Sequence, residues 1–201
     1  MDPSPAQRGV KPLTKAHAEA VADLHQSGIA TGFLSSLGRT FLRQLYRAIP
    51  TCPAGFGFVW VEADNVLGFI ACAEDTGRLY KQALRRRGLW MAIPLIRFLC
   101  RPSVIRRMIQ TLRYPSTCEA DLPWAELLSI VVAERGRGRG IGRALVSAMG
   151  EECRGRGIAR ARVAVWTGNE PACRFYEQCG FVLAQTREHH GRPTNIYVID
   201  C

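Results

Sequence analysis

A stretch of alternating arginine and glycine at residues 135–143 joins two segments with different hydrophobic patterns. Residues 127–133 (LLSIVVA) form a nearly continuous apolar run, which is typical of a strand buried on both faces. Residues 141–154 carry apolar side chains at helical spacing instead. A glycine-rich turn from a buried strand into a helix exposes consecutive backbone N–H groups at the positive end of the helix dipole. The segment therefore predicts an anion site, and Arg137, Arg139 and Arg143 add positive charge that suits a diphosphate.

The spacing of the glycines does not fit two common phosphate-binding turns. A dinucleotide fingerprint needs the pattern G-x-G-x-x-G, and its third glycine would fall on Ile141, Arg143 or Leu145. A P-loop needs Gly-Lys-Ser/Thr, which does not follow here. A flexible Arg-Gly tail that binds nucleic acid is also disfavoured, because it would not lie between two segments with such strong structural patterns.

Periodicity assigns the rest of the chain to helices and strands. Helices are predicted at residues 13–27, 34–49, 141–154 and 171–179, and strands at 56–62, 66–73, 127–133, 161–166, 181–187 and 195–200. Because strands and helices alternate in the second half, we expect one mixed α/β sheet in a single domain over residues 1–201.

The composition excludes several classes of protein. Hydrophobic residues make up 47% of the chain and charged residues 22%, which is near the ordinary globular values and unlike disordered or fibrous chains. The eight cysteines include no C-x-x-C pair, so no metal site is expected, and we interpret them as reduced core residues of a cytoplasmic protein. The longest near-apolar run, residues 88–96, is too short to span a membrane.

The formal net charge of +10 is concentrated in one segment. Residues 78–113 contain ten basic residues and no acidic one. They belong to an insertion at about residues 77–115, predicted to form two helices at 77–99 and 103–112 with a kink at Pro94. Three roles remain open: a lid with solvated arginines, a patch that binds an anionic membrane surface, and a surface that recognises an anionic acceptor. Nucleic acid is the least favoured partner, because aromatic residues for base stacking are sparse.

Two motifs point to a known family. Residues 137–142 match the signature Arg/Gln-x-x-Gly-x-Gly/Ala with Arg137, Gly140 and Gly142, and a second motif follows at 169–181 (NEPACRFYEQCGF). With these motifs in this order, the sequence resembles the GNAT superfamily of acyl-CoA-dependent N-acetyltransferases. The resemblance covers roughly residues 13–201 apart from the insertion, and it implies a mixed, mostly antiparallel central sheet flanked by helices. One departure is Glu134, where many relatives have proline.

The resemblance implies a site for acetyl-CoA as cosubstrate, without a metal. In such a site the strand ending at Val132 pairs with the pantetheine arm, and Asn169 contacts the same arm. The residues that would bind the pyrophosphate are Arg137, Gly138, Arg139, Gly140, Gly142 and Arg143.

Amide formation needs a neutral amine and a proton for the departing thiolate. The resemblance assigns the acid role to Tyr176, whose phenol stays protonated at neutral pH; the alternative is that Tyr176 only packs beside the cosubstrate. Glu126 is the candidate base, because it lies six residues before Val132 and shares its strand face if the side chains alternate. The alternative for Glu126 is a solvated residue at a strand end.

The sequence therefore predicts a cytoplasmic N-acetyltransferase, with the membrane periphery as a second possible location. Its reaction would move an acetyl group from acetyl-CoA to a primary amine of a small molecule or glycan precursor by direct attack. The resemblance puts the acceptor near residues 25–37. The alternative function is an acyl-CoA-binding protein with weak catalysis that docks on a membrane or another anionic surface. The intact motif residues favour the enzyme.

Overall fold

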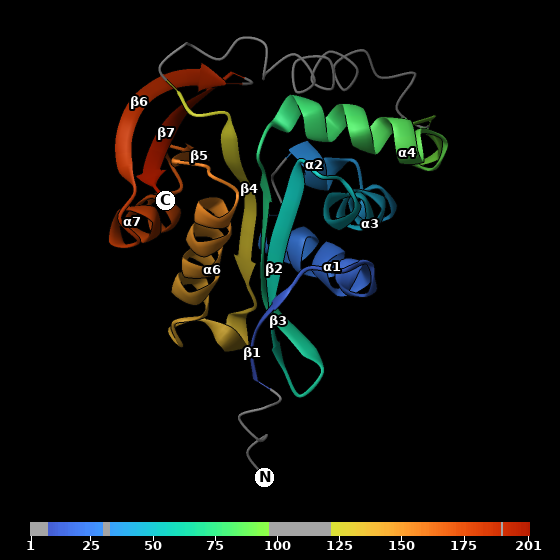
Figure 1. Cartoon of the computed structure of the whole chain (residues 1–201), viewed down its shortest axis with the longest axis horizontal. Helices are drawn as coiled ribbons and strands as arrows, with labels where there is room; N and C mark the ends of the chain where they lie inside the picture. The colour runs from blue at the N-terminus through green and yellow to red at the C-terminus, as the bar shows by residue number, and fades with distance from the viewer. Residues whose placement is uncertain (1–7, 30–32, 97–121, 190) are drawn as a thin grey trace.

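The computed structural model describes residues 8–29, 33–96, 122–189 and 191–201. Their centre is a seven-stranded sheet with helices on both faces (Figure 1). The strand order is β1-β2-β3-β4-β5-β7-β6, and each neighbouring pair is antiparallel except β4–β5. This confirms the predicted mixed, mostly antiparallel sheet. The strands are β1 Arg8–Pro12, β2 Gly55–Glu62, β3 Asn65–Ala73, β4 Ala125–Val132, β5 Arg160–Trp166, β6 Val182–His189 and β7 Arg192–Asp200.

Two groups of helices cover the sheet, and each encloses an apolar core. Side chains of β3 alternate between the two cores: Phe69 packs under the first group and Ile70 under the second. This alternation is expected of a strand covered on both faces. The first group is α1 Ala18–Gly28, α2 Phe33–Ser36, α3 Arg39–Ala48 and α4 Thr76–Ile96, and the second is α6 Ile141–Gly155 and α7 Glu170–Gln178 (Figure 1).

The structure corrects the predicted elements near the N-terminus. Strand β1 was not predicted, because its five residues carry too few apolar side chains to show a pattern. The helix predicted from residue 13 begins only at Ala18, after a short 3₁₀ turn at Lys15–His17. The helix predicted at 34–49 is interrupted at Gly38, whose φ of 88° is not helical. Because glycine adopts positive φ without strain, this residue separates α2 from α3.

The described part of the insertion is one helix. α4 continues through Pro94 to Ile96, and the second helix predicted at 103–112 lies outside the described residues. No helix among the described residues is both long enough and apolar enough to cross a membrane. Within the same residues, the cysteines are free thiols and no cluster of side chains suited to a metal ion is found.

Candidate functional site

The site begins where β4 and β5 separate. These parallel strands pair only through Ala125 and Glu126 of β4 with Ala161 and Arg162 of β5. Beyond Glu126, β4 continues to Val132 while it pairs with β3 on its other side. The edge of β4 that faces β5 is therefore open over this length in the described part of the chain. An open strand edge can bind an extended ligand through its backbone N–H and C=O groups. The predicted pantetheine contact at Val132 falls on this edge.

The glycine turn follows the C-terminal end of β4 and leads into α6. Gly138 and Gly140 have φ angles of 72° and 77°, in the left-handed region that favours glycine. Gly140 is the N-cap residue of α6, and no side chain caps this helix. The N–H of Ala144 donates to the carbonyl of Gly140, so the N–H groups of the three residues between them have no acceptor within the helix. Three such donors at a helix N-terminus suit the predicted anion.

Gly142 has a different role from the other glycines of the turn. A Cβ atom at this position would lie 2.9 Å from Cε2 of Phe175, too close for an unstrained contact. The missing side chain lets the first turn of α6 pack directly on α7. Gly142 therefore makes room for the Phe175 ring between the helix with the open donors and the helix that carries Tyr176.

The arginines of the turn have separate contacts. Nη2 of Arg139 donates to Oε2 of Glu62 on β2 at 2.6 Å, and Nη2 of Arg143 donates to the carbonyl of Gln178 at 3.4 Å. Arg137 is exposed. The Arg139–Glu62 pair is partly exposed, and such pairs contribute little net stability. A phosphate can therefore compete with Glu62 for this guanidinium.

Asn169 is the N-cap residue of α7. Its Oδ1 accepts a hydrogen bond from the N–H of Ala172 at 3.4 Å, which is the usual capping bond of asparagine. The side chain is exposed, and the cap leaves its Nδ2 donor for a ligand. The cap and the predicted contact with the pantetheine arm are therefore compatible.

Tyr176 lies in an aromatic cluster beneath α7. Its ring makes edge contacts with Phe175 and Phe181, at centroid distances of 5.5 and 5.4 Å. Burial raises the pKa of the phenol, so Tyr176 stays protonated at neutral pH and remains a proton donor. Because Phe175 also touches the position of Gly142, the glycine turn and Tyr176 belong to one packed unit.

A β-bulge in β4 overturns the expected alternation between Glu126 and Val132. Leu127 pairs with Cys72 and Ser129 with Ala71 of β3, so Leu128 is an extra residue. An extra residue reverses the faces that follow it. Val132 packs in the core under α6 and α7, whereas Glu126 faces α4 and accepts a hydrogen bond from Oγ1 of Thr76 at 3.1 Å. The expectation that Glu126 and Val132 share a face was wrong.

Glu126 is also neither solvated nor free. Its Oε2 accepts a hydrogen bond from Nη2 of Arg162 at 3.0 Å, and only 10% of the Glu126 side chain and 1% of the Arg162 side chain are exposed. Sequence reasoning missed Arg162. The signal that could have found it was a basic residue among the small and apolar residues in the middle of β5.

The acceptor side is described only in part, because residues 30–32 lie outside the described chain. His25, in the segment expected to line the acceptor, is buried, and its Nδ1 lies 2.5 Å from the hydroxyl of Tyr46. Burial lowers the pKa of His25 to about 4, so the ring is neutral at neutral pH.

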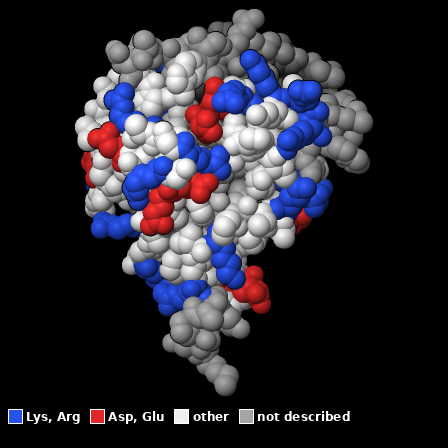
Figure 2. All heavy atoms as spheres, in the orientation of Figure 1, with Lys and Arg blue, Asp and Glu red and all other residues white. Residues whose placement is uncertain are grey.

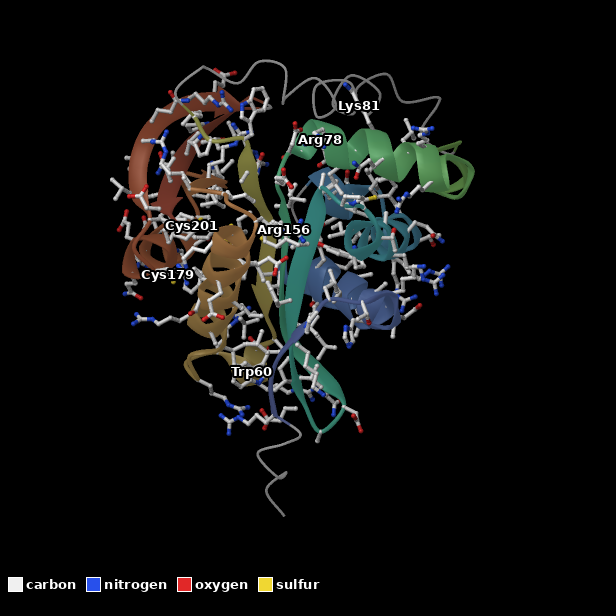
Figure 3. The ribbon with its side chains drawn as sticks, viewed as in Figure 1. Trp60, Arg78, Lys81, Arg156, Cys179 and Cys201 are labelled. Atoms are coloured by element: carbon white, nitrogen blue, oxygen red, sulfur yellow. The ribbon has the colours of Figure 1, made fainter. Side chains whose placement is uncertain are left out.

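At the end of the sheet where β4 begins, Figure 3 shows Arg78 and Lys81 of α4, with Trp60 at the opposite end.

Comparison with solved structures shows the same fold in several acetyltransferases. Ard1 from Thermoplasma volcanium has a TM-score of 0.61 and 19% identity, with 96% of this chain and 97% of that chain covered. NAA60 from Arabidopsis thaliana in complex with acetyl-CoA has a TM-score of 0.61 and 15% identity, with 96% and 98% covered. The ribosomal-protein-S18-alanine N-acetyltransferase from Escherichia coli has a TM-score of 0.58 and 16% identity, with 96% and 93% covered. At these identities the likeness concerns the fold.

Sequence comparison identifies the family. Among curated proteins, none matches this chain. The model of the acetyltransferase (GNAT) family matches residues 28–181, a span that includes the open edge of β4, the glycine turn and Tyr176. Because this match covers well over half of the chain, the protein belongs to the acetyltransferase (GNAT) family.

Proposed function

We propose that this protein transfers the acetyl group of acetyl-CoA to a primary amine of a small molecule or glycan precursor. The observation that carries the proposal is the continuity between the open edge of β4 and the uncapped N-terminus of α6. Together they offer backbone hydrogen bonds to an extended arm and three N–H donors to a diphosphate at its end. Acetyl-CoA has these two parts in this order.

The residues of the glycine turn fit this ligand. A Cβ atom added at Gly138 or Gly140 would meet no atom within 4 Å, so the space over the turn is open to a ligand. Arg137, Arg139 and Arg143 bring formal positive charge to the same turn. Figure 2 shows basic side chains gathered at the lower end of the molecule and again over α4. We assign the pyrophosphate to the turn and the pantetheine arm to the strand edge that ends at Val132, with Asn169 beside it.

Tyr176 is the proposed general acid. Bound acetyl-CoA supplies a thioester, whose acetyl carbon accepts the amine nitrogen while its C–S bond breaks. The protonated phenol of Tyr176 donates its proton to the departing sulfur, so coenzyme A leaves as the neutral thiol. The predicted base, Glu126, is hydrogen-bonded to Arg162, so in this proposal the amine attacks in its neutral form, and the proton that it loses passes through water to the Tyr176 phenolate.

A thiol-release assay tests the proposal. Acetyl-CoA is offered with amino sugars, small aliphatic amines, polyamines and peptides with free N-termini. We expect release of coenzyme A to depend on an amine of the first two classes, with mass spectrometry showing one added acetyl group on the acceptor. Release that depends on no amine would refute the transferase, and release with peptides alone would refute the small acceptor. The cytoplasmic location stays a prediction.

We also propose that α4 contacts an anionic membrane surface. Its described part presents Arg78, Lys81 and Arg85 to solvent, and Leu84 among them is 55% exposed. Basic and apolar side chains on one helix favour lipid interfaces. Flotation with phosphatidylcholine vesicles, with and without phosphatidylserine, tests this role. We expect binding only with phosphatidylserine, and loss of binding in Lys81→Glu/Arg85→Glu; equal recovery in both vesicle types, or none, would refute it.

A further inference from the structure

A charged side chain is completely buried where β4 and β5 separate. Arg162 is 1% exposed and is the largest of the fully buried side chains in the described residues. Its Nη2 and Nε donate to Oε2 of Glu126 at 3.0 and 3.4 Å. Burying a guanidinium costs several kcal/mol unless a partner compensates the charge. Glu126, opposite Arg162 on the neighbouring strand, supplies that partner.

The ion pair coincides with the last backbone pairing between the strands. Glu126 and Arg162 are also register partners, and they are the final pair before the strands separate. The bulge at Leu128 follows immediately on β4. Thr76, at the start of α4, donates to the same carboxylate oxygen at 3.1 Å. The pair therefore ties β4, β5 and α4 together at the closed end of the open strand edge.

Oε2 of Glu126 accepts hydrogen bonds from both Arg162 and Thr76, so its geometry suits an ion-pair partner better than a catalytic base. Removing the charge of Glu126, as in Glu126→Gln, would take from the buried guanidinium the counterion that it has on β4. Among the described residues, the polar groups that face Glu126 are Arg162, Thr76 and Tyr80. Burial raises the pKa of the Tyr80 phenol, and the negative charge of Glu126 raises it further. Tyr80 therefore stays a neutral phenol at neutral pH and adds no second negative charge beside Glu126.

We propose that Glu126 and Arg162 form a positioning pair, which fixes how far β4 stands from β5 and thereby shapes the open edge of β4 for the cosubstrate arm. This inference rests on the proposed function, because it needs acetyl-CoA to bind along that edge. In this proposal Glu126 positions β4 through its ion pair with Arg162 and does not take a proton from the acceptor amine. The two residues should then affect cosubstrate affinity together, whereas a base would affect turnover alone.

Three variants test the pair: Arg162→Met, Glu126→Gln and the double variant Glu126→Gln/Arg162→Met. We expect each single variant to weaken acetyl-CoA binding in calorimetry by about tenfold or more, since small displacements of a binding edge are costly. The double variant should bind more tightly than either single one, because it removes the buried carboxylate and the buried guanidinium together instead of one charge without the other. Glu19→Gln is the control: it breaks an exposed pair with Arg39 at 2.8 Å, and its affinity should equal that of the wild type.

A catalytic base at Glu126 would give the opposite results. Glu126→Gln would then keep its acetyl-CoA affinity, lose kcat and the acidic limb of the pH–rate profile, and show no recovery in the double variant. Should Arg162→Met not fold, Arg162→Gln removes the charge but keeps a polar side chain, and wild-type affinity in that variant would refute the pair. A wild-type protein that binds no acetyl-CoA would refute the proposed function itself, whereas binding that is equal in all variants would refute only the positioning pair.

Discussion

Replacing Gly140 by aspartate should nearly abolish acetyl-CoA binding. The new carboxylate would stand at the N-cap of α6, beside three N–H donors that the helix itself leaves open. A hydrogen bond to a charged group contributes about 1.5–3 kcal/mol. Two charges about 5 Å apart repel by about 3 kcal/mol at an effective dielectric constant of about 20. Loss of one or two donors together with this repulsion amounts to at least about 4 kcal/mol, or about a thousandfold in Kd.

The chain contains a matched control for this substitution. Gly157, in the turn after α6, has a φ of 71°, close to the 77° of Gly140, and a Cβ atom at either position meets nothing within 4 Å. Aspartate at either site therefore causes the same backbone strain, about 1–2 kcal/mol. Only Gly140 lies at the uncapped helix N-terminus. Gly157→Asp should lose at least as much stability as Gly140→Asp, because only the aspartate at the N-cap of α6 gains hydrogen bonds from the open N–H donors.

Calorimetric titration of acetyl-CoA into both variants tests this prediction by measuring the Kd of each. We expect the Kd of Gly157→Asp to stay within about twofold of the wild type, as for a substitution away from the site. Unfolding midpoints of the two variants, measured alongside, show how much stability each substitution costs. The assignment of the diphosphate to the glycine turn would be refuted if Gly140→Asp bound acetyl-CoA as tightly as Gly157→Asp.

Three further outcomes are expected. Tyr176→Phe should lower kcat by about a hundredfold with an unchanged Kd for acetyl-CoA, because only the donated proton is lost; full turnover would reduce Tyr176 to a packing residue. Gly142→Ala should cost about 1–3 kcal/mol in urea unfolding and also lower kcat, because its methyl group meets the Phe175 ring; unchanged stability would contradict the close packing of α6 on α7. Burial lowers the pKa of His25 to about 4, so the unfolded state binds the proton first as the pH falls below about 6.5, and stability should drop between that pH and 4 by about 3 kcal/mol. His25→Asn should lack this part of the pH dependence, and equal slopes for both proteins would refute it.

The strand, turn and helix around the glycine turn were predictable because local chemistry determines them. A continuous apolar run favours a strand covered on both faces, glycines permit positive φ, and helical spacing of apolar residues sets the start of α6. The mixed sheet follows from the order of such segments. Short elements without a pattern, such as β1 with its five residues, could not be found this way, because pairing with β2 is what holds them.

The surroundings of Glu126 depended on contacts between segments far apart in the chain. Alternation predicted one face for Glu126 and Val132, but a bulge opposite Cys72 added a residue and reversed it. The partner of Glu126 lies 36 residues further along, on a strand that only the folded sheet brings beside β4. The amino-acid sequence by itself determined the glycine turn and the helix start at which we propose that an anion binds, since backbone conformation and helix ends are local properties. Only the tertiary structure decided which side of β4 each side chain faces and which charges meet in the interior, because strand register is a property of two strands together.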